Sequence, residues 1–253
     1  MPVLAVIPAR LGATRLPRKP LRLLGGAPLV MQVWRRVAAL DGIDRCVVAT
    51  DSEDVRDALR GEGANCEMTS PDHPSGTDRV AEVARRDAYR AFDIIVNVQG
   101  DEPFIAADAI RGAAEIVASG RFELGTASAP ASAEILQTPH VVKVVTADDG
   151  RALYFSRAAI PHLREPADAP IRDAAIRQHL GVYAYRRDAL ARWVALPEHR
   201  LERIERLEQL RPLAAGMHMG VAASADVAPP GVDTEEDLAH ANARWDDFIA
   251  RRS

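Results

Sequence analysis

The sequence predicts an α/β fold with a doubly wound, mainly parallel sheet and a small inserted lobe. Short apolar runs alternate with longer segments of helical periodicity, and several of these runs are apolar almost throughout. Such strands are covered on both faces, as in parallel sheets. Alternation of strand and helix predicts right-handed crossovers, so the carboxyl ends of the parallel strands, where ligands bind in such folds, should share one edge.

The elements of the main sheet follow in order along the chain. The expected strands are residues 3–7, 45–50, 93–99, 123–128 and 217–222. The helices expected between and after them are residues 28–40, 53–60, 77–90, 107–119 and 234–250. This order predicts one domain over residues 1–253.

The middle of the chain has a different pattern. Shorter strands are expected at residues 141–146, 153–155 and 180–185, and they surround an irregular segment at 161–177. That segment has three prolines and mixed charges, so it is predicted to be a mobile loop. We therefore expect residues of roughly 129–190 to form the inserted lobe.

Composition excludes several classes of protein. The net charge of −4 and the pI of about 6.0 argue against a nucleic-acid partner, so the basic residues should act locally in a site. No apolar run is long enough to cross a membrane, and the apolar start is too short for a signal peptide. Cys46 and Cys66 lie in apolar runs without zinc-site spacing, which favours buried free thiols. The sequence predicts a soluble, cytoplasmic protein.

Four cations follow the first strand within ten residues: Arg10, Arg15, Arg18 and Lys19. Such a group repels itself unless an anion neutralises it, and arginine and lysine both bind phosphate or carboxylate. A solvated basic loop is the alternative. The position at the end of a strand favours an anion site, and the loop lacks the P-loop pattern.

Acidic residues follow other predicted elements. Asp101 and Glu102 come after the strand at 93–99 and, beside a basic loop, are typical of a Mg²⁺ site; a simple turn is the alternative. Thr234 and Asp237 can cap the last helix, which leaves Asp233 available as a second metal ligand.

Three further segments are polar. Residues 72–79 lead into a helix, and their small side chains would let a flat ring approach the backbone; an N-cap by Ser75 or Thr77 is the alternative. A histidine at a strand start, such as His179, is more often structural than a ligand. The helix expected at 203–215 carries Glu208 and Gln209, which on their own indicate a solvated face.

Together these stretches resemble the 3-deoxy-manno-octulosonate cytidylyltransferases. The resemblance extends from Ile7 to about Leu238 and rests on phrases that occur in order: IPAR, TRLP, KPL, ATD, SGT, NVQGDEP, ALYFSR with IP, HLGVYAYR, EQLR and GVDT. Any one phrase is weak, but the ordered set is specific. It separates this group from the sialic-acid-activating enzymes.

The resemblance implies a nucleotide-diphospho-sugar transferase-like, Rossmann-like fold and a Mg²⁺-dependent reaction. CTP and 3-deoxy-D-manno-octulosonate (Kdo) would give CMP-Kdo and pyrophosphate for lipopolysaccharide synthesis. The implied catalytic residues are Lys19, Arg10, Asp101 and Asp233, of which Asp101 and Asp233 would bind the metal. The implied CTP residues are Ala9, Arg10, Lys19, Ala49, Asp51, Ser75, Gly76, Thr77 and Arg79. The implied sugar residues are Arg15, Gln99, Arg157, His179, Tyr185, Glu208 and Gln209. It also implies that the inserted lobe contributes to the sugar site and to a homodimer.

The chain departs from the family pattern at four positions, one of which is His140 in place of an asparagine. Ala13 replaces a serine and Arg18 replaces a glycine in the basic loop. Pro212 lies inside the helix expected at 203–215, and we expect it to kink or end that helix near Leu210 or Arg211.

Other functions remain open at this point. A related sugar acid, such as 8-amino-Kdo or a nonulosonic acid, is the alternative substrate. A nucleotide-binding regulator without catalysis should lack Asp101, Asp233 or Lys19, and all three are present. A structural or interaction protein leaves the basic loop and the strand-end acids unexplained.

Overall fold

The computed structural model describes residues 1–12, 15–225 and 229–250, which divide into two compact units. The first unit contains residues 2–93, 97–105 and the described residues from 229 onward. The second contains residue 1, residues 94–96 and the described residues from 106 onward as far as 225. This division does not test the predicted single domain with a lobe at roughly 129–190, which stays a prediction.

The strands of the main sheet in the first unit are parallel. β1 (Val3–Ala9) pairs with β4 (Arg45–Thr50), which pairs in turn with β5 (Asn65–Met68). Leu4 to Ile7 of β1 are fully buried, as predicted for a strand covered on both faces. A separate hairpin joins β2 (Leu23–Leu24) to β3 (Ala27–Pro28).

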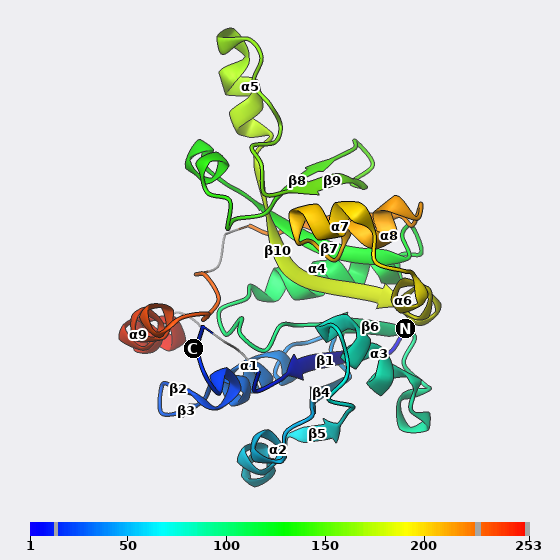
Figure 1. The fold of residues 1–253 in the computed structure, drawn as a ribbon, viewed down its shortest axis with the longest axis vertical. Helices are drawn as coiled ribbons and strands as arrows, with labels where there is room; N and C mark the ends of the chain where they lie inside the picture. Colours follow the sequence, from blue (N-terminus) through cyan, green and yellow to red (C-terminus); the bar gives the residue numbers. More distant parts are fainter. Residues whose placement is uncertain (13–14, 226–228, 251–253) are drawn as a thin grey trace. The chain divides into compact units, whose positions relative to one another are not determined.

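Three helices pack against these strands (Figure 1): α1 (Leu29–Ala38), α2 (Glu53–Leu59) and α3 (Gly76–Arg85). The last is shorter than predicted, because residues Asp87–Tyr89 form a separate 3₁₀ helix. Other 3₁₀ turns lie at Lys19–Leu21 and Arg60–Glu62. The single helix predicted over 234–250 is two helices, α9 (Glu235–Ala243) and α10 (Trp245–Ala250).

A buried apolar cluster links the basic loop to the end of the chain. Leu16 of the loop and Val232, next to Asp233, are both fully buried in it. Its other members are Leu24, Leu29, Phe104, Leu238 and Ala241, with Trp245 and Phe248 packed against them. The basic loop and the segment that carries Asp233 are thus held by the same buried cluster, although they are far apart in the sequence.

The second unit is built around mixed pairing. β10 (Arg177–Arg186) lies antiparallel to β7 (Leu124–Pro130), which is parallel to β11 (Met219–Ala223). On the other side of β10 comes β6 (Ile94–Asn97). A further pair, β8 (Lys143–Thr146) and β9 (Ala152–Ser156), is antiparallel and joins β10 through Lys143.

Helices cover this unit at several points. α4 (Ala107–Ala118) lies along β7, β10 and β11, and α6 (Arg187–Ala195) packs on β10 (Figure 1). The segment 161–177 contains a 3₁₀ turn at Pro166–Asp168 and α5 (Ala169–Ala174), so the expectation of an irregular loop was wrong. Pro170 lies in the first turn of α5, where a missing N–H costs nothing. Another 3₁₀ helix spans Ala133–Gln137.

The expected effect of Pro212 was also wrong. The predicted helix at 203–215 is two helices, α7 (Arg200–Glu205) and α8 (Leu210–Ala214). The break comes at Arg206, which has a left-handed φ of 54°. Pro212 lies in the first turn of α8 and therefore removes no bond that the helix needs.

Cys46 is buried and Cys66 is partly exposed, and both are free thiols. The prediction of two buried thiols is thus confirmed only for Cys46. Burial raises the pKa of Cys46 to about 12 and that of Cys66 to about 11.

Gly125 of β7 allows helix α4 to approach the strand closely. A methyl group there would overlap the carbonyl oxygen of Ala113 and lie 3.1 Å from Val117 Cγ2. We expect Gly125→Ala to lower the free energy of unfolding by about 2–3 kcal/mol, since overpacking forces backbone shifts. Urea unfolding checks this against Gly181→Ala in β10, where a Cβ meets nothing within 4 Å. Equal unfolding energies for the two variants would contradict it.

Candidate active site

The first unit contains a cavity of about 430 Å³ at the ends of its parallel strands. Four segments line it: the basic loop after β1, the start of α3, the turn after Asn97 and Asp233. The lining residues are Pro8, Ala9, Arg10, Gly12, Arg15, Lys19, Pro20, His73, Ser75, Gly76, Arg79, Gln99, Gly100, Asp101 and Asp233. The predicted gathering of the basic loop and the acids at one site is confirmed within this unit.

Lys19 is the central cation of this cavity. Its Nζ lies 2.5 Å from Asp101 Oδ2 and 2.8 Å from Asp233 Oδ1. Burial lowers the pKa of Lys19, but the two carboxylates outweigh burial and leave that pKa raised. Arg15 pairs with the other oxygen of Asp233 at 2.9 Å. Lys19 is therefore fixed as a cation between two carboxylates.

Glu102 adds a third carboxyl to this region. Burial raises its pKa to about 8, and the nearby charges of Asp101 and Asp233 act in the same direction. A Cβ at Gly231 would come within 2.9 Å of Glu102 Oε1 and 3.0 Å of the Asp101 carbonyl. Glycine at this position therefore permits the close approach of the two acidic segments. A hydrogen bond from the Val232 N–H to Asp101 O, at 2.8 Å, joins them.

The acids can be tested for their fit to a magnesium ion. Among the described residues, no group of three or more His, Cys, Asp or Glu side chains is arranged to hold a metal. Asp101 and Asp233 nevertheless converge on one cation, the Lys19 ammonium. Mg²⁺ is usually held by one or two carboxylates together with substrate phosphates, so this pair fits an ion that arrives with a nucleotide.

The start of α3 forms another wall of the cavity. Ser75 caps the helix by accepting from the Asp78 N–H at 3.2 Å, which confirms the N-cap considered for this segment. A Cβ at Gly76 would lie 3.3 Å from Pro8 Cγ, so glycine here lets the start of α3 pack closely against Pro8 at the end of β1.

Among the remaining residues predicted for CTP, Arg79 lines the cavity. Arg79 is 3% exposed and reaches Thr69 Oγ1 and, at 3.4 Å, Asp51 Oδ2. The second oxygen of Asp51 is buried without a hydrogen-bond partner among the described residues. Ala49 and Thr77 are buried and do not line the cavity.

Arg18, where the family pattern has glycine, has a left-handed φ of 57°. This conformation favours glycine, and it costs other residues about 1–2 kcal/mol. Its guanidinium donates to Asp54 Oδ2 at 2.7 Å, and both side chains are more than half exposed. Arg18 is absent from the cavity lining, so its charge faces α2. Ala13 lies outside the described residues.

The remaining sugar residues of the prediction lie in the second unit. His179 is 9% exposed, and its Nε2 lies 2.9 Å from Thr126 Oγ1. Its ring packs on Phe155 and Tyr183. Tyr185 is fully buried against Trp193, while Gln209 is 3% exposed at the start of α8.

Glu208 lies near the same aromatic group. Burial raises the pKa of Tyr183 well above its ordinary value, and the nearby groups Tyr185 and Glu208 add to the rise. His179, Tyr185 and Glu208 thus share one neighbourhood around Tyr183. Their contact with a sugar stays a prediction.

Arg157 is held by backbone carbonyls. Its guanidinium donates to Glu205 O at 2.8 Å, to Pro139 O at 3.1 Å and to Arg206 O at 3.4 Å. The fully buried Lys143 donates in turn to the carbonyl of Arg157 at 2.6 Å. This support fixes Arg157 within its unit. Lys143 was missed from the sequence because an isolated lysine in a strand carries no recognisable motif.

A buried neutral histidine makes stability depend on pH. Burial lowers the pKa of His179 to about 3, from about 6.5 for an imidazole in water. The unfolded chain therefore binds an extra proton below pH 6.5, and stability falls from there toward pH 3 by up to about 1.4 kcal/mol per pH unit. Urea unfolding of wild type and His179→Gln between pH 7 and 4 checks this. We expect a shallower slope in the variant, and parallel slopes would contradict it.

Comparison with known proteins shows the family of the chain. The family model described as "Cytidylyltransferase" matches residues 4–219. A 3-deoxy-manno-octulosonate cytidylyltransferase of Gemmatimonas aurantiaca is 59% identical over 253 residues, covering 100% of this chain and 98% of that protein. The chain belongs to the 3-deoxy-manno-octulosonate cytidylyltransferases.

Further relatives agree with the family and the fold. A 3-deoxy-manno-octulosonate cytidylyltransferase from Azorhizobium caulinodans is 47% identical, covering 95% of this chain and 94% of its own. A solved structure of CMP:2-keto-3-deoxy-manno-octonic acid synthetase complexed with CTP is 38% identical, with a TM-score of 0.89 and coverage of 98% and 99%. The 4-diphosphocytidyl-2C-methyl-D-erythritol synthase of Anaerococcus prevotii, at 13% identity and a TM-score of 0.63, shares the fold, covering 97% and 98%.

This cytidylyltransferase has the predicted α/β fold with a mainly parallel sheet, since these structural matches extend over nearly the whole chain. No helix in the described part of the chain has both the length and the apolar composition that a membrane span requires. The residue roles that the family resemblance implied remain to be argued from this chain's own geometry.

Proposed function

We propose that this cytidylyltransferase transfers CMP from CTP to Kdo and releases pyrophosphate. One observation carries the proposal: a basic loop lines a nucleotide-sized cavity with Lys19 fixed between Asp101 and Asp233. Attack of the sugar's anomeric hydroxyl on the α-phosphorus forms an O–P bond and breaks the bond to pyrophosphate. The roles below are part of the proposal.

The basic residues would bind the triphosphate. Arg10 and Lys19 line the cavity and are the implied phosphate contacts. Negative charge grows on the leaving pyrophosphate, and cations fixed beforehand stabilise that charge most. Arg15 and Gln99 line the same cavity, so they support binding of a second substrate beside the nucleotide.

Asp101 and Asp233 would hold Mg²⁺. The ion would supply charge neutralisation for the phosphate oxygens. Apart from it, Lys19 orients both carboxylates and, together with Arg15, offsets their charge in the free enzyme. We identify no dedicated general base for the sugar hydroxyl.

The sugar carboxylate needs a cation, and Arg157 is the proposed one. Hydroxyl recognition needs both donors and acceptors, which His179, Tyr185, Gln209 and Glu208 can supply. The shared neighbourhood of His179, Tyr185 and Glu208 supports this assignment.

A pyrophosphate-release assay tests the function directly. Each nucleoside triphosphate is supplied with Kdo, 8-amino-Kdo or a nonulosonic acid in the presence of Mg²⁺. We expect release with CTP and Kdo. Faster release with another sugar acid would establish the alternative substrate, and no release with any sugar acid would overturn the proposal.

Homodimer formation and a cytoplasmic location complete the proposal. Ile171 of α5 and Leu153 of β9 are 72% and 52% exposed, and both lie in the lobe to which the family resemblance assigns the dimer contact. Analytical ultracentrifugation should give twice the chain mass. The free thiols of Cys46 and Cys66 are compatible with a reducing compartment.

A further inference from the structure

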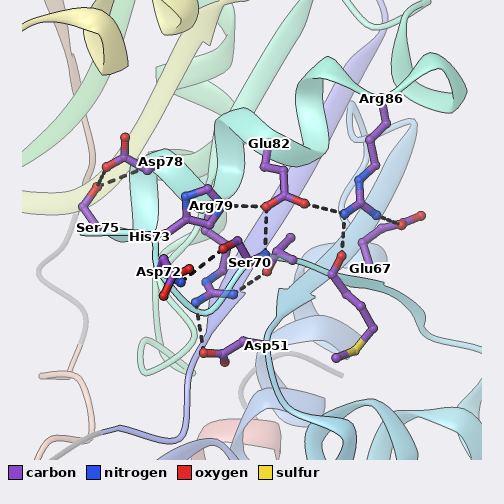
Figure 2. Close-up of polar contacts among 12 residues, drawn as sticks. Asp51, Glu67, Ser70, Asp72, His73, Ser75, Asp78, Arg79, Glu82 and Arg86 are labelled. Carbon is purple, nitrogen blue, oxygen red and sulfur yellow. Dashed lines mark hydrogen bonds and ion pairs between the residues drawn. The ribbon is translucent and has the colours of Figure 1, made fainter.

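A polar network on one face of α3 holds the loop that leads into this helix (Figure 2). Arg79, Glu82 and Arg86 are three and four residues apart and therefore share a face. Arg79 donates to the Thr69 hydroxyl, Glu82 accepts from the Ser70 N–H at 2.9 Å, and Arg86 donates to the Met68 carbonyl. The last residue of β5 and the two residues after it are thus bound by α3 and its C-cap residue.

Glu82 also binds His73, farther along the same loop. The His73 Nε2 lies 2.5 Å from Glu82 Oε2, and Figure 2 shows this contact beside the one to Arg86. Burial raises the pKa of Glu82, but the Ser70 N–H, His73 and Arg86 outweigh it and lower that pKa to about 2. Glu82 is therefore an ionised acceptor at neutral pH, so the Nε2 of His73 carries the hydrogen.

This tautomer leaves Nδ1 of a neutral His73 as an acceptor. No hydrogen bond to Nδ1 is found in the described part of the chain, and His73 lines the nucleotide cavity. Since Glu82 occupies Nε2, a ligand can meet only Nδ1 or the ring face.

The polar side chains near His73 on this wall, Ser75 and Arg79, bind other residues of the protein. The Ser75 hydroxyl donates to Asp78 Oδ2 at 2.7 Å, and the buried Arg79 reaches Thr69 and Asp51. Cytosine carries a 4-amino donor where uracil carries a carbonyl oxygen. An acceptor in this wall would accept a hydrogen bond from the amino group of cytosine and would repel the carbonyl oxygen of uracil.

We propose that His73 is a specificity-determining residue that selects the cytosine base of CTP over uracil, and that Glu82 is the positioning residue that fixes its ring and tautomer. The inference rests on the proposed function, because it assigns the base contact of that same cavity. Neither residue needs to take part in the phosphoryl transfer.

The test is the ratio of kcat/KM for CTP to that for UTP, measured by pyrophosphate release with Kdo. In His73→Gln the side-chain amide can still donate to Glu82, but no atom replaces Nδ1. We expect the ratio to fall about tenfold, which matches the loss of one base-discriminating contact. In Glu82→Gln either orientation of the amide places a donor against the Ser70 N–H or against Arg86. The His73 ring then loses its fixed position, so the same fall is expected from a residue behind His73.

The matched control is Glu67→Gln. Glu67 binds Arg86 and accepts from the Tyr89 hydroxyl at 2.6 Å, so it belongs to the same network without touching His73. We expect its ratio to equal that of wild type. Thermal unfolding of each variant shows which proteins are folded. If His73→Gln does not fold, the ratio measured for Glu82→Gln tests the inference.

Three results would overturn the inference. They are equal use of CTP and UTP by the wild type, a ratio within twofold of wild type in a folded His73→Gln or Glu82→Gln, and an equal fall in Glu67→Gln. Failure of the wild type to release pyrophosphate from any triphosphate would instead overturn the proposed function, so the two failures are distinguishable.

Discussion

Replacing Lys19 with methionine should lower kcat by about 10²–10³-fold. A fixed charge contact to a developing oxyanion contributes roughly 2.7–4 kcal/mol to the barrier. Methionine keeps the length of the side chain but removes the ammonium that lies 2.5 Å from Asp101 and 2.8 Å from Asp233. Single-turnover pyrophosphate release at saturating CTP and Kdo measures the effect on the reaction itself.

Arg18→Met provides the control for this prediction. It removes another cation from the same loop, one that pairs with Asp54 and lies outside the cavity lining. Exposed pairs contribute about 0–1 kcal/mol to stability, so both stability and kcat should stay close to wild type. A kcat for Lys19→Met within threefold of wild type, or an equal loss in Arg18→Met, would show that Lys19 has no special role in turnover.

The strands that the sequence predicts well are those whose apolar character is continuous. β1 and β4 are buried over most of their length, so their continuous apolar sequence identifies them as strands without knowledge of the rest of the fold. β5 has the sequence Asn-Cys-Glu-Met and is partly exposed throughout, so its pairing with β4 could not be seen in its residues. Its place depends on the tertiary structure.

Helix ends were predicted less well for a related reason. The break after α7 comes at Arg206, a non-glycine residue in a left-handed conformation, which no local rule anticipates. Pro212, the residue that rules for helices single out, has little effect because the preceding break places it in a first turn. Local propensity therefore pointed to the right segment and to the wrong residue.

The charged part of the candidate site was the most predictable. Lys19, Asp101 and Asp233 were expected from position alone, because each follows a strand or precedes a helix at one edge of the sheet. His73 and Glu82 were not in the predicted set. Their relation depends on a turn that brings residues 9 positions apart to within 2.5 Å, and sequence spacing does not show this.

Replacing Asp101 or Asp233 with asparagine should collapse turnover without lowering stability. Each change removes one proposed metal ligand, and we expect kcat to fall by at least about 10²-fold even at saturating Mg²⁺. In the free enzyme, Lys19 keeps one carboxylate in either variant. Burial raises the pKa of Asp233, but Lys19 and Arg15 outweigh burial and leave that pKa lowered, so the ionised carboxylate favours the fold. The ion pairs of Asp233 are partly exposed and contribute only about 0–1 kcal/mol each. We therefore expect unfolding energies within about 1 kcal/mol of wild type.

The combination of lost activity and retained stability distinguishes a binding role from a structural one. A variant of a side chain that serves the fold loses stability and activity together, whereas a variant of a side chain kept for a ligand loses activity with little loss of stability. Asp54→Asn supplies the comparison, because Asp54 forms an exposed pair with Arg18 and should change neither quantity. Near-normal rates at saturating Mg²⁺ for Asp101→Asn or Asp233→Asn would remove that residue from the metal site, while marked destabilisation would show that the carboxylates chiefly serve to hold Lys19.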